Sequence, residues 1–310
     1  MPAETPAETP VLAALDCGTH TTRLLISTAT GQELKRSVTI TNLGEGISDT
    51  GVLLEPAMLR TQECLAGYRQ VMKDYNVSDY RIVATSAARD AHNRDEFFAK
   101  ITDVMGRSPE LLSGEEEART AFAGATSALN PEDGPYLVCD IGGGSTEFAF
   151  GSQQCEAVLS ADMGSSRLTQ QFIKHDPALP EELSACLSVV QLHLDDLLSA
   201  IPKASSAKQL VGLAGTVTTA AAVEIGMYDP EKVHHFCLSK AAAEDVFRTL
   251  ATEDREQRLS NPGLHPGRVD VIVGGLCILV KIMRYLDFEE CLVSEADLLD
   301  GLIAGIQREN

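Results

Sequence analysis

The stretch that decides the fold is Tyr136–Gly151, which reads YLVCDIGGGSTEFAFG. Apolar residues lead into Asp140, three glycines follow at 142–144, and a second apolar segment closes the stretch. This order predicts a buried strand, a tight turn and a returning strand. The glycines would let the backbone adopt positive φ and let a ligand approach without meeting a Cβ. Such a turn can direct N–H groups at phosphate oxygens, with Asp140 and Glu147 beside it as oxygen ligands for Mg²⁺.

A single turn of this kind is more often an ordinary glycine-rich hairpin, but the pattern occurs twice. Residues 11–26, VLAALDCGTHTTRLLI, have the same order: an apolar strand, Asp16, Gly18 two residues later, hydroxyl residues and a returning strand. Asp16 and Asp140 are 124 residues apart (140 − 16), which is the size of a small domain. The repeat predicts two related lobes that face each other across a phosphate-binding cleft.

Length and composition narrow the class of protein. A chain of 310 residues has room for two domains, and its alternating strand-like and helix-like segments indicate the α/β class. No apolar run reaches the ~18 residues of a membrane span, so we expect no membrane contact. The net charge of −20 argues against nucleic-acid binding. A polyanionic substrate would need locally clustered arginines or accompanying divalent cations.

The chain divides into three parts in this interpretation. Residues 1–10, MPAETPAETP, predict a disordered acidic tail without a targeting signal, and hence a cytoplasmic protein. Lobe I spans 11–131, and lobe II spans 132–310, with a last helix that could pack back on lobe I. The eight scattered cysteines form no CxxC pair and predict buried thiols. Strands are expected at 35–40, 81–85, 156–160, 210–213 and 291–294, and helices at 55–75, from 113, 180–201, 269–286 and 297–306.

Three further places carry candidate site residues. Ser113 and Glu116 fit a capping box at a helix start, and the neighbouring Glu117 could project into the cleft as a base. Arg89 follows a predicted strand end, where it could reach the cleft or lie on the surface. The turn at 215–216, Gly-Thr, opens a helix whose N-terminus could bind an anion or pack closely on a strand.

The motifs that are absent exclude some chemistries. The chain has no G-x-x-x-x-G-K-[ST] nucleotide loop and no G-x-S-x-G nucleophile elbow. Carboxylates and glycine turns remain, and these are the groups needed for metal-assisted attack of water on a phosphoryl group.

Six motifs in one order resemble the exopolyphosphatase / guanosine pentaphosphate phosphohydrolase (Ppx/GppA) family over residues 11–306. They are DCGT from Asp16, LGEGI from Leu43, ATSAARDA from Ala84, SGEEEAR from Ser113, DIGGGSTE from Asp140 and GT from Gly215. The resemblance implies an actin-like ATPase fold (that of actin, sugar kinases and heat-shock chaperones) with two ribonuclease-H-like lobes and a cleft between them. It also implies hydrolysis of the terminal phosphate of inorganic polyphosphate or of the 5′ γ-phosphate of pppGpp.

The resemblance also implies roles for individual residues. Glu117 falls on the family's general base, Arg89 on a catalytic arginine, and Asp140 and Glu147, with Asp16, on the groups that handle Mg²⁺. The implied phosphate-binding residues are Gly18, Thr19, His20, Thr21, Gly142, Gly143, Gly144, Ser145, Gly215 and Thr216. His20 departs from the family's usual asparagine at that turn position, and it would either add a titratable phosphate contact or merely tolerate the turn.

The sequence therefore predicts a Mg²⁺-dependent phosphohydrolase, with polyphosphate ahead of pppGpp as substrate. A kinase or ATPase of the same fold and a sensor that binds (p)ppGpp or polyphosphate without turnover are the alternatives. Mn²⁺ in place of Mg²⁺, a monovalent cation and a homodimer all remain open.

Overall fold

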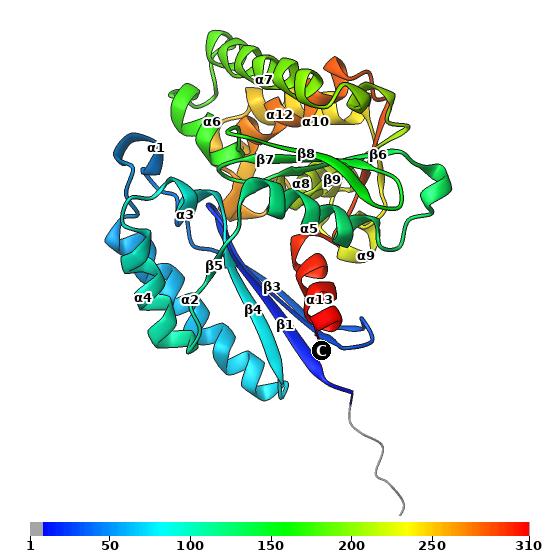
Figure 1. Cartoon of the computed structure of the whole chain (residues 1–310). Coiled ribbons are helices and arrows are strands. Elements are labelled where there is room, and N and C mark those ends of the chain that lie inside the picture. Colours follow the sequence, from blue (N-terminus) through cyan, green and yellow to red (C-terminus); the bar gives the residue numbers. More distant parts are fainter. Residues whose placement is uncertain (1–8, 310) are drawn as a thin grey trace, which may run out of the picture.

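A computed structural model describes residues 9–309 of the chain as two lobes, each built on a mixed β-sheet (Figure 1). The sheet of the first lobe has the strand order β3-β2-β1-β4-β5. Most of the predicted tail lies outside the described residues. The strands are β1 (Val11–Cys17), β2 (Thr21–Thr28), β3 (Glu33–Ile40), β4 (Asp79–Ala84) and β5 (Glu110–Leu111).

The sheet of the second lobe has the order β10-β11-β9-β6-β7-β8. Its strands are β6 (Tyr136–Ile141), β7 (Thr146–Gly151), β8 (Cys155–Ala161), β9 (Gln209–Leu213), β10 (Cys237–Ser239) and β11 (Glu290–Val293). Both sheets start with an antiparallel three-stranded meander, β1-β2-β3 or β6-β7-β8, and then add a parallel strand beside the first, β4 or β9. The two lobes thus share one topology, as the repeated sequence pattern predicts.

The central strands are buried on both faces, which explains their nearly continuous apolar sequences. In β1, Ala13 and Leu15 face the cluster under the outer helices of lobe I, and Leu12 and Ala14 face the cluster between the lobes. In β6, Leu137 and Cys139 face the outer helices of lobe II, and Val138 faces the cluster between the lobes. The outer helices of lobe I include α2 (Glu55–Asp74) and α4 (Arg94–Met105), preceded by the short α1 (Ile47–Thr50) and α3 (Ser86–Asp90).

Most helices of the second lobe pack around the buried cluster that includes Leu137 and Cys139, and those labelled α7, α10 and α12 lie above the sheet in Figure 1. The helices of this lobe are α6 (Ser165–Phe172), α7 (Pro180–Ala200), α8 (Ala214–Ile225), α9 (Pro230–Val233), α10 (Lys240–Thr252), α11 (Arg255–Leu259) and α12 (Ile272–Tyr285). The predicted helix over 269–286 begins only at Ile272, because the 3-10 turn Pro266–Arg268 and a bend precede it.

Two helices cross between the sheets. The first, α5 (Gly114–Thr126), lies against β7 and β8, whereas α13 (Leu298–Glu309) lies against β1 and β4 (Figure 1). They approach closely because each presents a glycine: a Cβ on Gly124 would stand 2.0 Å from the Asp297 carbonyl oxygen, and one on Gly301 would stand 2.0 Å from the Thr120 carbonyl oxygen. The last helix of the chain therefore covers the first sheet, and a helix from the first half covers the second. The division at 131/132 stays a prediction.

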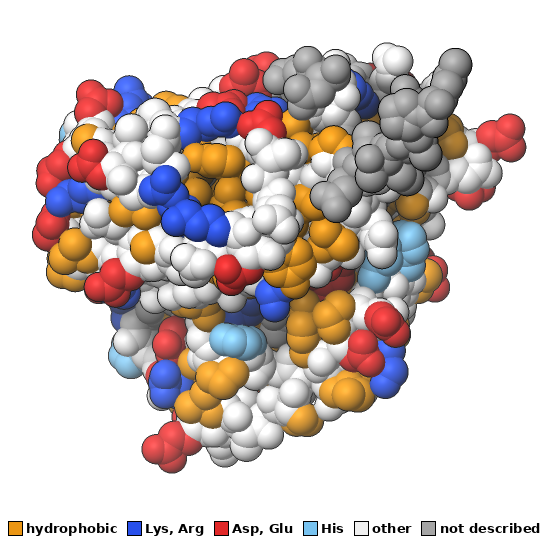
Figure 2. Space-filling model, turned by 90° about the horizontal axis from the view of Figure 1, so that it is seen from below, with side chains coloured by type: hydrophobic (Ala, Val, Ile, Leu, Met, Phe, Trp, Pro, Cys, Tyr) orange, Lys and Arg blue, Asp and Glu red, His pale blue; other side chains and the backbone are white. Residues whose placement is uncertain are grey.

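The charges on the surface and the burial of the cysteines can be compared with what the composition predicts. On the face seen in Figure 2, acidic and basic side chains are interspersed, with groups of hydrophobic side chains between them. All eight cysteines are free thiols, and five of them are buried as predicted. Cys64 and Cys155 are half-buried and Cys237 is exposed, so the prediction of buried thiols is wrong for these three. Among the described helices, none combines the length and the apolar character that crossing a bilayer requires.

Candidate active site

A polar cavity of about 110 Å³ lies where the two hairpin turns meet. The β1–β2 turn comes from one lobe and the β6–β7 turn from the other, so the cavity exists only because the lobes face each other. Most of the predicted site residues line it: Asp16, Gly18, Thr19, His20, Thr21, Glu117, Asp140, Gly142, Gly143, Gly144, Ser145 and Gly215.

The glycines of the second turn are required by contact across the lobes. A Cβ on Gly144 would stand 2.5 Å from the Ser86 Oγ and 2.6 Å from the Thr19 Oγ1, and one on Gly143 would stand 3.0 Å from the His20 Cβ. None of the glycines 142–144 has a φ in the left-handed region. The prediction of positive φ in this turn is therefore wrong, and close approach to the opposite lobe is the reason for glycine at 143 and 144.

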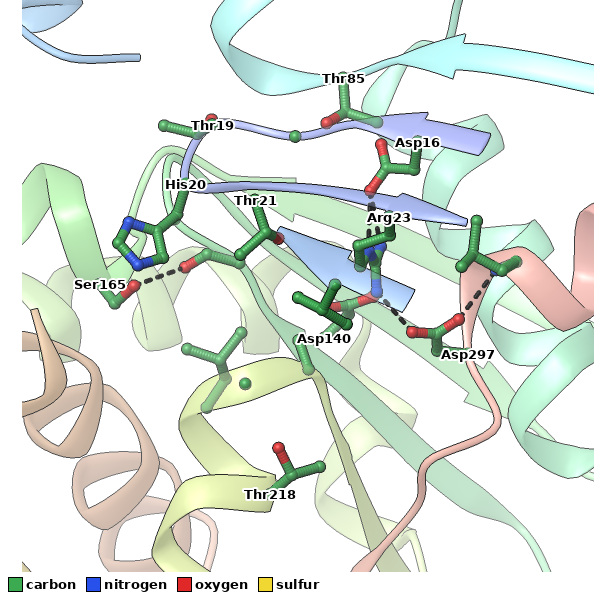
Figure 3. A pocket seen from close by; sticks show the side chains of 18 of the residues that line it. Asp16, Thr19, His20, Thr21, Arg23, Thr85, Asp140, Ser165, Thr218 and Asp297 are labelled. Carbon is green, nitrogen blue, oxygen red and sulfur yellow. Dashed lines mark hydrogen bonds and ion pairs between the residues drawn. The ribbon is translucent and has the colours of Figure 1, made fainter. Parts of the chain in front are cut away.

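The β1–β2 side of the cavity is built around an arginine. Asp16 and Arg23 are cross-strand partners, and the Arg23 guanidinium donates to the Asp16 Oδ2 from Nε at 3.0 Å and from Nη2 at 2.7 Å. Arg23 also donates to Asp297, at the start of α13 (Figure 3). Burial raises the pKa of Asp16, and the Arg23 charge opposes that rise. The Asp16 Oδ1 is buried and has no hydrogen-bond partner, so one acceptor remains available for a ligand.

The β6–β7 hairpin carries two carboxyl groups, of which Asp140 lines the cavity, and it has no arginine of its own. Asp140 and Glu147 are cross-strand partners and are 5% and 2% exposed. Burial raises the pKa of Asp140 to about 7, and burial together with the Asp140 charge raises that of Glu147 to about 7. The Ser160 hydroxyl donates to the Glu147 Oε1 at 2.8 Å. Acidic groups held this way favour a bound cation.

Glu117 reaches the cavity from the first turn of α5. Ser113 and Glu116 form the predicted capping box, in which the Ser113 N–H donates to the Glu116 Oε2 at 2.9 Å. The helix therefore starts at a fixed residue and directs Glu117 inward, where its carboxyl group is 8% exposed. Arg89 Nη1 donates to the Glu117 Oε2 at 2.6 Å. Burial, followed by the Glu147 charge, raises the pKa of Glu117 well above its usual range, and Arg89 opposes this.

Three predicted residues do not line the cavity. Arg89 lies behind Glu117 and Ser145, with its Nη2 3.3 Å from the Ser145 Oγ and 3.6 Å from the Glu147 Oε1. Glu147 lies beneath this arginine. The side chain of Thr216 packs toward α12, where a Cβ on Gly275 would stand 2.4 Å from its Oγ1. At the start of α8, only Gly215 of the predicted pair faces the cavity.

The predicted Mg²⁺ agrees with the type of donor and with the unpartnered Asp16 Oδ1. Carboxylate oxygens are the ligands that Mg²⁺ prefers. Across residues 9–309, no three His, Cys, Asp or Glu side chains are arranged to hold a metal by themselves. Mg²⁺ commonly keeps several waters and uses one or two carboxylates together with substrate phosphates. Asp16 and Asp140 suit this mode of binding, and the metal itself stays a prediction.

Several lining residues were missed from the sequence, among them Arg23, Asp297 and Arg268. Arg23 could have been found by folding the hairpin, because it stands opposite Asp16. No local sequence pattern indicated Asp297 or Arg268, because both lie far along the chain from the two hairpins. Asp297 stands at the start of α13, and Arg268 lies in a loop. Burial and the Arg23 charge lower the pKa of Arg268 to about 10, so it remains a cation at neutral pH.

His20 is held by the same distant loop. Its Nε2 lies 3.2 Å from the Gly267 carbonyl oxygen, so this nitrogen donates. Burial and the Arg268 charge lower the pKa of His20 to about 4. The ring is therefore neutral at pH 7 and joins the first turn to the second lobe.

Comparisons with known proteins agree with this geometry. The family model described as the Ppx/GppA phosphatase family matches residues 26–309. The chain is 37% identical over 309 residues to "Exopolyphosphatase 2" of Mycobacterium tuberculosis, covering 94% of this chain and 97% of the relative. It is 28% identical to the "Guanosine-5'-triphosphate,3'-diphosphate pyrophosphatase" of Vibrio vulnificus, covering 94% of this chain and 58% of that relative.

A solved structure of the Aquifex aeolicus Ppx/GppA family member is also similar. It has a TM-score of 0.78 and 29% sequence identity, and the match covers 97% of this chain and 99% of that one. Together with the duplicated sheet topology, this likeness confirms the predicted α/β fold with two lobes.

Proposed function

Since the chain belongs to the Ppx/GppA phosphatase family, we propose that it releases the terminal phosphate of inorganic polyphosphate. The main support is the position of Glu117. Its carboxyl group is buried, lies in the first turn of a capped helix and faces a cavity lined by two glycine turns. Near-complete coverage of a relative named exopolyphosphatase supports this choice of substrate. In the reaction, water adds to the terminal phosphorus, the bridging P–O bond breaks, and orthophosphate leaves.

The residues at the cavity have separate roles in this reaction. Glu117 takes a proton from the attacking water, and Arg89 orients its carboxylate through the 2.6 Å contact. The turns at 18–21 and 142–145 hold the phosphate oxygens, and Arg23 and Arg268 supply positive charge at the cavity wall.

Mg²⁺ would be held by Asp140 and Asp16, with Glu147 supporting Asp140 across the hairpin. When bound, it offsets the negative charge that develops on the phosphate oxygens. It would also keep the neighbouring carboxyl groups ionised, which Glu117 requires to act as a base.

The 5′ γ-phosphate of pppGpp is the second candidate for the leaving phosphate. The 28% identity to a guanosine pyrophosphatase supports it, although the chain spans only 58% of that relative. Both substrates end in a phosphoanhydride, so the same groups would act on each.

The test is the initial rate of phosphate release from polyphosphate, pppGpp and ATP, measured side by side with Mg²⁺. We expect polyphosphate to be hydrolysed fastest. Turnover of ATP alone would favour a kinase or ATPase, and tight polyphosphate binding without phosphate release would favour a sensor.

A further inference from the structure

The start of α6 holds the carbonyl groups of the second hairpin turn. The Ser165 N–H donates to the Gly142 carbonyl at 2.9 Å. The N–H groups of Ser166 and Arg167 both donate to the Gly143 carbonyl, at 2.9 and 3.0 Å. The first N–H groups of a helix have no partner inside the helix, so the turn satisfies those of α6. The turn and the helix start are thus fixed to each other.

The third carbonyl of the turn is held by a side chain. Arg167 Nε donates to the Gly144 carbonyl at 2.6 Å, and Arg167 Nη2 donates to the Asp90 Oδ2 at 2.5 Å. Asp90 ends α3 in the first lobe and Arg167 lies on α6 in the second, and Figure 1 shows these helices on the two sides of the lobe boundary. One guanidinium therefore joins the second hairpin turn to the opposite lobe.

The direction of each carbonyl also decides the direction of the next N–H group. The cis peptide bonds of residues 9–309 lie elsewhere, so those of the turn are trans, with C=O and N–H pointing in opposite directions. Because α6 holds the three carbonyls, the N–H groups of Gly143, Gly144 and Ser145 point away from that helix. Within the described residues, these three N–H groups donate to no protein acceptor. Successive free donors of this kind form a concave site for an anion.

The peptide that joins Gly144 to Ser145 stands between two cavities. Gly144 lines the 110 Å³ cavity between the hairpin turns, which we call the inner cavity, and also a small cavity of about 10 Å³. Of these two cavities, Arg167 and Asp90 line only the small one, and Ser145 lines only the inner one. The carbonyl of this peptide faces Arg167, so the Ser145 N–H faces the opposite way, on the side of the inner cavity.

We propose that Arg167 is a positioning residue for the terminal phosphate, and that Asp90 fixes Arg167 from the first lobe. A turn of three glycines does not fix its own peptide planes, because glycine adopts most backbone conformations at little cost. Arg167 supplies that restraint through the Gly144 carbonyl, and the Ser145 N–H then points at a phosphate oxygen. The inference rests on the proposed function and adds to it a residue that lies outside the inner cavity.

The test compares Arg167→Gln with the wild type in two measurements. One is kcat and KM for a polyphosphate of fixed length with Mg²⁺, and the other is the Kd of orthophosphate by calorimetry. Loss of one hydrogen bond to a charged group should raise KM and Kd by about tenfold. The terminal phosphate is charged before the reaction as well as in the transition state, so kcat should fall by less than KM rises.

Arg258→Gln is the matched control. Arg258 Nη2 donates to the Asp176 Oδ1 at 2.6 Å, and its Nη1 donates to the Glu253 carbonyl at 2.6 Å, so it too joins a carboxylate to a backbone carbonyl. Arg258 is buried and lines neither cavity. Chemical denaturation should show a loss of stability in both variants, and only Arg167→Gln should change KM and Kd. Equal rises in both variants, or wild-type values in Arg167→Gln, would overturn the role of Arg167.

Two milder variants test the link to the first lobe, and they decide the matter if Arg167→Gln does not fold. Arg167→Lys keeps a charge but loses the planar fork, so its KM should lie between those of the wild type and Arg167→Gln. Asp90→Asn weakens a partly exposed ion pair and should raise KM by about two- to threefold. Wild-type KM and Kd in Arg167→Lys would overturn the role of the fork, and a wild-type KM in Asp90→Asn would overturn the part assigned to Asp90.

The two measurements also separate this inference from the proposed function. Absence of phosphate release from the wild-type protein would overturn the proposed function. The Kd of orthophosphate would still decide whether Arg167 positions a phosphate, because that measurement needs no turnover.

Discussion

The two hairpin turns at the cavity have the same backbone and opposite chemistry. In each, the N–H of a glycine donates to a carbonyl three residues later at 3.0 Å: Gly18 to Thr21 in one, and Gly142 to Ser145 in the other. In each, an aspartate faces the residue seven positions further on. That residue is Arg23 in the first turn and Glu147 in the second.

This difference, Arg23 in one turn and Glu147 in the other, gives the two turns separate roles. The first turn contains a cation of its own, Arg23, which forms an ion pair with Asp16 and also donates to Asp297 at the start of the last helix. The second carries two carboxyl groups of raised pKa, and its nearest cations are Arg23 and Arg89, both from the first lobe. A repeated backbone thus supplies a neutralised wall and an acidic wall, and the acidic wall suits a cation and a base.

The largest expected effect concerns Glu117, the base that α5 places beside this acidic wall. Glu117→Gln removes the base and should lower kcat by roughly 10²–10⁴-fold, the usual contribution of a positioned general base. Substrate should still bind, because both turns remain. The control is Glu116→Gln, which keeps a capping box and should cost little. Phosphate release and equilibrium binding of polyphosphate measure the two expectations; an inactive Glu116→Gln beside an active Glu117→Gln would move the base to Glu116.

Removing the cation of the first turn tests stability. Arg23→Gln leaves Asp16 buried without its partner, and leaves Asp297 only its 3.6 Å contact with Arg36. The change should lower the free energy of unfolding by about 3 kcal/mol, as for other broken buried pairs. Arg60→Gln breaks a 2.6 Å pair with Glu45 that is largely exposed and should cost less than about 1 kcal/mol. Chemical denaturation measures both, and equal losses would show that Arg23 has no special role.

Asp140→Asn tests the cation expected at the second turn. The change keeps the shape of the side chain and removes a charge, so the affinity for Mg²⁺ should fall by roughly 10–100-fold. A titration of activity and of binding heat with Mg²⁺ measures this, with Asp133→Asn on the exposed turn at 131–133 as the control. Wild-type Mg²⁺ dependence in Asp140→Asn would show that this carboxyl group only shapes the turn.

The smallest expected effect concerns His20, whose counterpart in the second turn is Gly144. The pKa of His20 is about 4 in the folded protein and 6.5 for an ordinary histidine, so only the unfolded chain takes up the proton in between. Stability should therefore fall as the pH drops from 6.5 towards 4, by about 1 kcal/mol over the first pH unit.

Denaturation at pH 7 and at acid pH measures this slope. His20→Asn should flatten it, whereas His193→Asn, a control in α7, should leave it unchanged. A slope that is the same in wild type and His20→Asn would remove His20 as its source.

The sequence by itself determined the local features. Both hairpins, the Ser113 capping box and the buried strands follow from patterns that span ten to twenty residues, within reach of propensity and periodicity. The repeat of the hairpin predicted two lobes, and the motif order predicted most residues of the inner cavity. The reason for glycine at 143 and 144 was misjudged, because the contacts that demand it come from the opposite lobe.

Only the tertiary structure decided which distant groups meet. Arg23 and Asp297 are 274 residues apart, and His20 and Gly267 are 247 apart, so no local pattern could pair them. The crossing of α5 and α13 depends on glycines in two helices that pack only once both sheets are formed. Such contacts depend on the summed packing of both lobes, which a linear sequence does not display.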